Sequence, residues 1–70
     1  MADDIVLKFG KNVKALRLKK GLTQAQLGLL CEPAMLQQNV AEYEKGHLAP
    51  SLKTAAVIAK ALRVDIKELL

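Results

Sequence analysis

Two glutamines and a glutamate near the middle of the chain have side chains suited to recognising other polar groups. If residues 37–45 are helical, Gln37, Gln38 and Glu42 lie on one side of the helix, and Val40 and Tyr43 lie on the other. A glutamine can bond to both N6 and N7 of adenine, and a glutamate can accept a hydrogen bond from N4 of cytosine. The pattern is typical of a surface that reads base edges while its back rests on a core. It also fits a helix face that meets only water, and the glutamine pair alone leaves both interpretations open.

The other reactive side chains are too few and too scattered for catalysis or metal binding. Cys31 is the only cysteine and His47 the only histidine, and neither has a cluster of further ligands at usable spacing. We therefore expect no catalytic residue, no metal site and no cofactor, and we do not expect an enzyme. A lone cysteine forms no internal disulfide, which suits a reducing compartment, so we expect Cys31 to be a small core residue.

The composition indicates one small domain that favours polyanions. The 70 residues include 11 Lys and Arg against 7 Asp and Glu, which gives a formal net charge of +4. This excess of positive charge is modest, but it favours a polyanionic partner such as nucleic acid over a basic one. No run approaches the roughly 20 apolar residues that a membrane-spanning helix needs, so no membrane partner is expected.

The first twenty residues have the pattern of an amphipathic helix. An apolar residue recurs at spacings of four, four and three, at Ile5, Phe9, Val13 and Leu16. This spacing predicts a single buried stripe along the helix. Asp3 and Asp4 suit a helix start, and Gly21 is expected to close the helix in a left-handed cap.

Local signals divide the middle of the chain into two short helices joined by a turn. Thr23 and Gln26 have the spacing of a capping box, which predicts a helix start at that point. Gly28 costs this helix roughly 1 kcal/mol relative to alanine, and we expect the close approach of a second helix to explain it. Pro33 and Gly46 bound the following helix, because proline disfavours a helical residue before it and glycine suits a C-cap.

The C-terminal third predicts one longer helix and one short helix. Ser51 is a suitable N-cap for the longer helix. Its expected inward face consists of Leu52, Ala55, Ile58, Ala59 and Leu62. Ala56 and Val57 fall off that face and are candidates for a subunit contact. Asp65 is expected to cap a last short helix over residues 66–70, and its apolar end needs a partner or a core to cover it.

Several motifs follow the order, and most of the spacing, of the Cro and lambdoid-repressor type of helix-turn-helix domain. They are Arg17, Gly21-Leu22-Thr23-Gln24, Leu27, Glu44-Lys45-Gly46, Pro50-Ser51-Leu52 and Ile58-Ala59-Lys60-Ala61-Leu62. The chain resembles this family over about four fifths of its length. The resemblance implies an all-α fold, a compact bundle of five short helices with a lambda-repressor-like DNA-binding domain. It places one domain over residues 1–70 and the helix-turn-helix at about 24–45.

The resemblance also implies which residues meet DNA. In such repressors the first residues of the recognition helix read base edges, which falls on Gln37 and Gln38, and a later reader falls on Glu42. The amide at the start of the preceding helix, here Gln24, contacts phosphate. The segment after the recognition helix, residues 46–48, lies along the DNA backbone. Together with the positive charge, this gives as expected backbone contacts Gln24, Lys19, Asn39, Lys45 and His47.

A structural ion pair is expected between Arg17 and Glu44. Arg17 lies on or beside the buried side of the first helix, and a half-buried guanidinium needs a carboxylate. Family members pair an arginine of the first helix with a glutamate at the end of the recognition helix, which falls on these two residues. We expect the pair to fix orientation more than to add stability.

Two departures from the family pattern concern the entrance to the recognition helix. The turn over residues 30–35 is two residues longer than usual by our count. Leu36 stands where the family has a serine or threonine N-cap, and a leucine side chain cannot accept a bond from the helix amides. These differences affect the depth and tilt of the helix in the groove.

Two functions compete on the sequence. The first is a sequence-specific regulator of transcription, such as a repressor, that binds double-stranded DNA as a homodimer. It would act in the cytoplasm, in association with the nucleoid, and be bacterial or phage-encoded. Its expected dimer contacts, in the C-terminal helices, are Ala56, Val57, Ile66 and Leu70. The alternative is a protein-interaction module of the same fold, an antitoxin or an adaptor. A phage-type repressor, a restriction–modification controller and part of a larger regulator all fit the first function.

Overall fold

A computed structural model describes residues 3–70, without the side chains of Asp3 and Asp4, so the role expected for those two carboxylates lies outside the described part. Four α-helices and one short 3-10 helix follow one another along the chain. They are α1 (Asp3–Lys19), α2 (Gln24–Leu30), α3 (Gln37–Lys45), α4 (Leu52–Leu62) and η1 (Ile66–Leu69). The all-α fold is confirmed, but the first helix is long, and the last element is a 3-10 turn that ends one residue earlier than expected.

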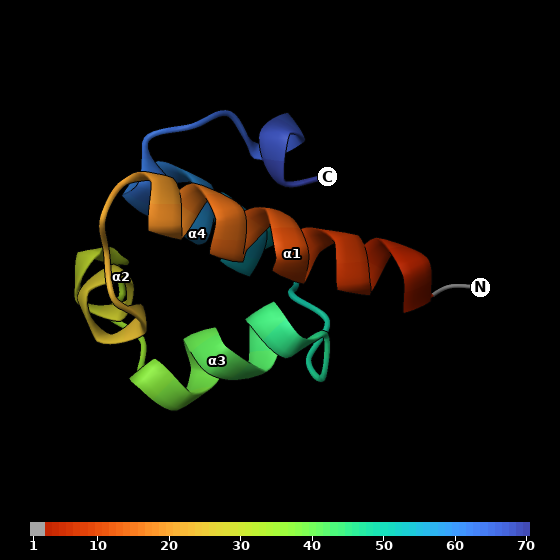
Figure 1. Cartoon of the computed structure of the whole chain (residues 1–70), viewed down its shortest axis with the longest axis horizontal. Helices are drawn as coiled ribbons and strands as arrows, with labels where there is room; N and C mark the ends of the chain where they lie inside the picture. The colour runs from red at the N-terminus through yellow and green to blue at the C-terminus, as the bar shows by residue number, and fades with distance from the viewer. Residues whose placement is uncertain (1–2) are drawn as a thin grey trace.

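The long helix α1 lies across the rest of the bundle (Figure 1). In that view α3 runs below α1, α4 lies behind it, and η1 closes the other side. Phe9 and Val13 of α1 are fully buried and meet Leu27, Val40 and the inner face of α4 in one apolar core. Because the chain has only two aromatic residues, aliphatic side chains make up most of this core.

Two residues expected in the core lie outside it. Ile5 is 57% exposed and Leu52 is 79% exposed. Each lies in the first turn of its helix, and both line an open hollow between the start of α1 and the start of α4. Helical spacing shows which side of a helix faces inward, but it does not show how tightly the neighbouring element packs there. The other inward positions of α4 are buried as expected, namely Ala55, Ile58, Ala59 and Leu62.

Glycines mark the two closest approaches of backbone to backbone. A Cβ on Gly28 would collide with the carbonyl oxygen of Met35, so the close neighbour is the segment that leads into α3 and not a second helix. The amide of Met35 also donates to the carbonyl of Gly28 at 2.9 Å, which fastens the long turn back onto α2. A Cβ on Gly10 would collide with the carbonyl oxygens of Tyr43 and Glu44, so this glycine lets α1 and α3 touch.

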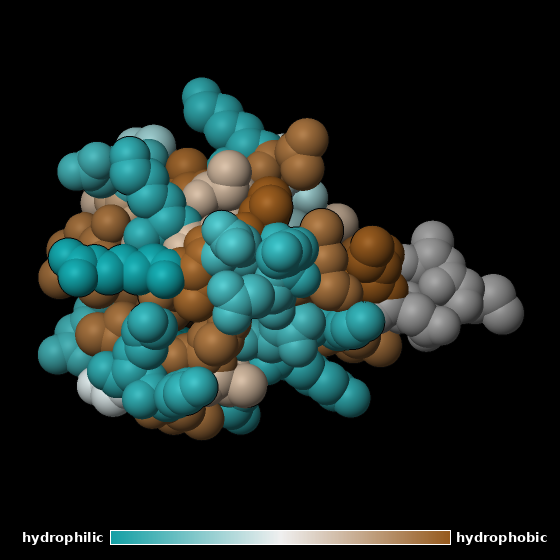
Figure 2. Space-filling model, turned by 90° about the horizontal axis from the view of Figure 1, so that it is seen from above, coloured by the Kyte–Doolittle hydropathy of each residue, from teal (hydrophilic) through white to brown (hydrophobic). Residues whose placement is uncertain are grey.

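The C-terminal turn is fastened to α1. Leu69 is fully buried, and the side-chain amide of Asn12 donates to its carbonyl at 3.0 Å. Leu70 is 46% exposed, so the apolar end of the chain covers the core with one leucine and leaves the next at the surface. The side of the molecule away from α3 is mostly polar, with apolar side chains exposed between the polar ones (Figure 2).

Candidate nucleic-acid interface

The first half of α3 presents an open polar edge. Gln37, Gln38 and Asn39 are all exposed, and Val40 on the reverse side is only 1% exposed. Tyr43 is half-buried, and its ring meets the edge of Phe9 with centroids 6.4 Å apart. The helix is therefore anchored along one side while the amides of its first turn point away from the core.

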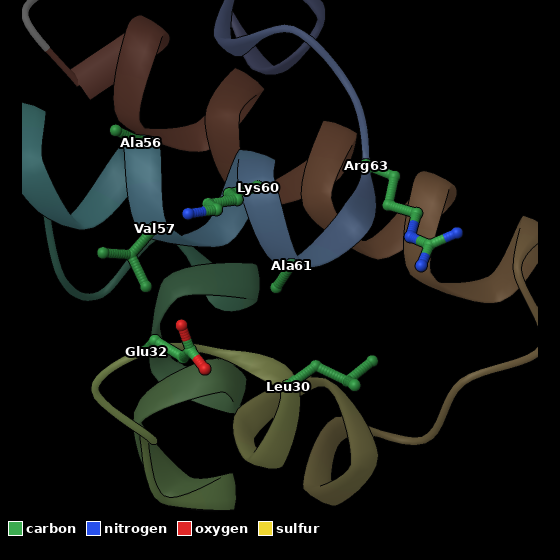
Figure 3. Close-up of a pocket in the computed structure, with 7 residues that line it drawn as sticks. All are labelled: Leu30, Glu32, Ala56, Val57, Lys60, Ala61 and Arg63. Atoms are coloured by element: carbon green, nitrogen blue, oxygen red, sulfur yellow. The ribbon is translucent and has the colours of Figure 1, made fainter.

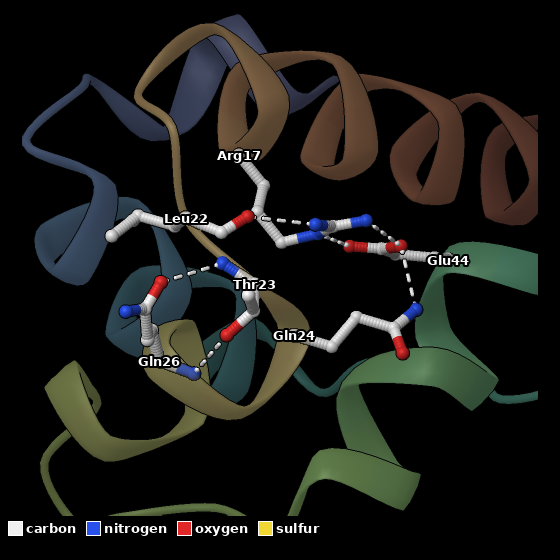
Figure 4. Close-up of polar contacts among 6 residues, drawn as sticks. All are labelled: Arg17, Leu22, Thr23, Gln24, Gln26 and Glu44. Carbon is white, nitrogen blue, oxygen red and sulfur yellow. Dashed lines mark hydrogen bonds and ion pairs between the residues drawn. The ribbon is translucent and has the colours of Figure 1, made fainter.

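A buried ion pair holds the other end of α3 (Figure 4). Arg17 Nε donates to Glu44 Oε2 at 2.6 Å, and Arg17 Nη2 donates to Glu44 Oε1 at 3.1 Å. The side chains are 9% and 3% exposed, and Arg17 Nη1 also donates to the carbonyl of Leu22 at 2.8 Å. This two-point geometry fixes the angle between the guanidinium and the carboxylate, and so fixes α3 relative to α1.

Gln24 at the start of α2 belongs to the same network. Its side-chain nitrogen donates to Glu44 Oε1 at 3.0 Å, and its oxygen points away from Glu44 (Figure 4). A primary amide has two N–H donors, so one is held by Glu44 and one remains. The family resemblance predicts a DNA-backbone contact for Gln24, but no local pattern predicts that Glu44 orients it, because that contact depends on how α2 crosses α3.

The two helices of the motif begin differently. Thr23 Oγ1 accepts from the amide of Gln26 at 3.0 Å, and Gln26 Oε1 accepts from the amide of Thr23 at 2.8 Å, so the capping box of α2 is confirmed. Leu36 precedes α3 in extended conformation and makes no side-chain cap. At its other end α3 closes on Gly46, whose φ of 78° is the left-handed conformation expected for a glycine cap.

Three residues assigned to different DNA contacts lie together at the end of α3. Glu42 Oε1 is 3.3 Å from His47 Nδ1, and Glu42 Oε2 is 3.9 Å from Lys45 Nζ. The left-handed Gly46 turns the chain back so that the amide of His47 also donates to the carbonyl of Glu42 at 3.0 Å. The carboxylate of Glu42, 40% exposed, thus lies beside two cationic or hydrogen-bonding side chains of its own chain.

The remaining expected residues are dispersed. Lys19 is exposed in the last turn of α1, on a different element from α3. Cys31 is buried in the core, and burial raises the pKa of its thiol above the ordinary value for a cysteine. Between residues 5 and 70 no group of three or more potential metal-ligating side chains lies together.

A short helix with exposed amides, held from behind by a second short helix and by a long first helix, defines a DNA-binding helix-turn-helix domain. The sequence pattern of the helix-turn-helix family (HTH_3) matches residues 13–69, and the chain belongs to this family. Its fold is the lambda-repressor-like one that the sequence predicted. The family is one of DNA-binding regulators of transcription and not of enzymes.

One solved structure resembles this chain over almost its whole length. It is the restriction–modification controller protein C.AhdI from Aeromonas hydrophila, with 31% sequence identity and a TM-score of 0.88. The match covers 97% of this chain and 96% of the controller chain. No curated protein sequence matches this chain. Within the part of the chain that the structure describes, no helix has the length and apolar character needed to span a bilayer.

Proposed function

We propose that this protein is a sequence-specific transcription regulator that places α3 in the major groove of double-stranded DNA. The observation that carries the proposal is the exposed edge of Gln37 and Gln38 on a helix whose reverse side, at Val40, is fully buried. Each good bidentate contact between a side chain and a base is worth roughly 1–3 kcal/mol of discrimination. Glu42 would add a third contact, with His47 and Lys45 setting the position of its carboxylate.

Backbone contacts would position this helix without reading sequence. Gln24 has one amide donor left beside the one held by Glu44, which suits a phosphate oxygen. The other proposed backbone contacts are Lys19, Asn39, Lys45 and His47, all of which are exposed. Each phosphate neutralised by a cation should add about 0.9 to the slope of log affinity against log salt.

We further propose that the protein binds a palindromic operator as a homodimer. Its longest dimension is 31 Å, whereas neighbouring half-sites on one face of DNA lie about 34 Å apart, so one chain reads only one half-site. Ala56 is exposed, Val57 and Ile66 are partly exposed, and Leu70 is 46% exposed, which leaves apolar surface for a second copy. Residues 1–70 act as one domain in this proposal.

The likeness to C.AhdI suggests the biological role. Its printed description is that of a restriction–modification controller protein, and 31% identity extends over nearly all of both chains. We propose that this chain has a similar regulatory role, acting on DNA in the cytoplasm of a bacterial cell. In this proposal Gln37, Gln38 and Glu42 set the operator that this chain recognises.

Selection of bound sites from a random duplex pool tests the proposal directly. We expect a palindromic consensus whose half-sites are centred one helical turn apart, about 10 base pairs. Adenine-containing half-sites would match the glutamines, and cytosine would match Glu42. A pool that yields no consensus, although the protein is folded and binds DNA at low salt, would contradict sequence-specific reading. A consensus with one isolated half-site would contradict the dimer.

A further inference from the structure

A hollow lies beside the part of α4 that faces away from α1. It has a volume of about 440 Å³ and lies between α4 and the long turn that follows α2. Leu30, Val57 and Ala61 form its apolar wall, and Leu30 is 52% exposed. In Figure 3, Val57 and Ala61 point from α4 toward the turn, and Leu30 lies on the other side of the gap. This surface includes part of the long turn, which departs from the family pattern.

Charges of opposite sign border the hollow on its two sides. Glu32 lies on the turn, Lys60 lies on α4, and Arg63 caps the C-terminal end of α4 (Figure 3). Among residues 5–70 no ion pair joins any of these three to another residue. By contrast, Arg17, Glu42 and Glu44 all have partners within the chain. The three charges on this surface are therefore available to an external partner.

Arg63 has a backbone conformation that is unusual for a residue with a side chain. It ends α4 with φ of 61°, the left-handed region that disfavours residues with a Cβ. The two other left-handed residues in the described part of the chain, Gly21 and Gly46, are glycines at equivalent helix ends. Arg63 thus has a small backbone cost that glycine would avoid, and its side chain is exposed at the border of the hollow.

We propose that this hollow docks a second copy of the chain, with Glu32 of each copy facing Arg63 and Lys60 of the other. The inference rests on the homodimer proposed above and names its charged contacts. A patch with an acidic side and a basic side about an apolar strip is complementary to itself after a rotation of 180°. The apolar strip supplies affinity, and the charges fix the register of the two copies.

Charge reversal at one position of each kind tests the pairing. In a homodimer of E32R, the new arginine of each copy faces Arg63 of the other copy. In a homodimer of R63E, the new glutamate of each copy faces Glu32 of the other copy. We expect each variant to raise the dimer dissociation constant by about tenfold at low salt, since two contacts become repulsive. An equimolar mixture of the two variants restores both contacts, so heterodimers should form with nearly the wild-type constant.

Sedimentation equilibrium of the full chain measures these constants, and circular dichroism confirms that each variant is folded. K53E is the matched control, since Lys53 is exposed on α4 and does not line the hollow. R63G is a second variant: it should raise the melting temperature by relieving the left-handed backbone, yet weaken the dimer. A purely structural role for Arg63 would leave the dissociation constant unchanged in R63G.

Two results would overturn this inference, and they differ in what they say of the homodimer. If E32R and R63E dimerise with the wild-type dissociation constant, and their mixture forms no excess of heterodimer, the copies meet at another surface and the homodimer stands. If the wild-type chain remains a monomer at all concentrations and salt levels, the homodimer itself is wrong. Preferential formation of the heterodimer from two weakened variants is the outcome that the proposed contacts predict.

Discussion

The two ends of the recognition helix α3 are held very differently. At its C-terminal end Glu44 is locked to Arg17 and Gln24, Gly46 caps the helix, and Gly10 of α1 touches the backbone. At its N-terminal end Leu36 provides no cap, and the first side chains are exposed. The fold thus fixes α3 at the end away from Gln37 and Gln38, the proposed base-reading pair, and leaves the end that carries these two glutamines exposed.

The largest effect is expected from breaking the locked end. Glu44→Ala leaves the guanidinium of Arg17 buried without its carboxylate, and removal of one partner of a buried pair costs about 3–5 kcal/mol. Chemical denaturation should show this loss in the free energy of unfolding. A chain of this size has little stability to spare, so much of the variant should be unfolded at room temperature.

The double variant Arg17→Met with Glu44→Leu is the control for that loss. Replacement of both charges with apolar side chains of similar size removes the unpaired charge and should recover most of the stability. If the single and the double variants are equally unstable, burial of an unpaired charge is not the cause. If Glu44→Ala lowers the free energy of unfolding by less than about 1 kcal/mol, the Arg17–Glu44 ion pair contributes no more than a solvent-exposed ion pair does.

A smaller effect is expected from Gly10→Ala, which probes the contact of α1 with the same end of α3. Helix propensity alone would make alanine stabilising by about 1 kcal/mol inside α1. The new methyl group would instead meet the carbonyl oxygens of Tyr43 and Glu44, and overpacking costs about 1–3 kcal/mol. We therefore expect a lower melting temperature, and a higher one would show that α1 and α3 separate easily.

The smallest effect, of opposite sign, is expected at the open end. Leu36→Ser supplies the missing N-cap of α3, which should stabilise the fold by about 0.5–1 kcal/mol, because Leu36 is 68% exposed and contributes little to the core. Thr23→Ala is the counterpart at the capped helix α2 and should cost about 1 kcal/mol. A higher denaturation midpoint for Leu36→Ser and a lower midpoint for Thr23→Ala would confirm that α2 has an N-cap and that α3 lacks one.

Local features of this fold could be predicted from sequence, and contacts between elements mostly could not. The capping box at Thr23 and the left-handed glycines at 21 and 46 depend on neighbouring residues only, and both are present. Ile5 and Leu52 continue their apolar stripes but line an open hollow and stay exposed, which periodicity cannot show. The neighbour of Gly28 was predicted as a helix and is the turn, because the sequence does not show how a long connection folds back.

The candidate site shows the same division. The Arg17–Glu44 contact could be expected because a charge beside a buried stripe needs a partner, and the family resemblance named it. The contact of Glu42 with Lys45 follows from helical i,i+3 spacing and is local. The bond from Gln24 to Glu44 depends on how α2 crosses α3, and His47 reaches Glu42 only because the chain folds back at Gly46, so these two contacts appear only in the assembled structure.

The central claim is that the open end of α3 reads bases, and Gln38→Ala tests it most directly. Affinity should be measured for the selected operator and for random duplex DNA under the same salt conditions. Loss of one bidentate contact should weaken operator binding by roughly 1–3 kcal/mol, while binding to random DNA stays nearly unchanged. Equal weakening on both DNAs, or no weakening on either, would contradict the assignment of Gln38 as a base-reading residue.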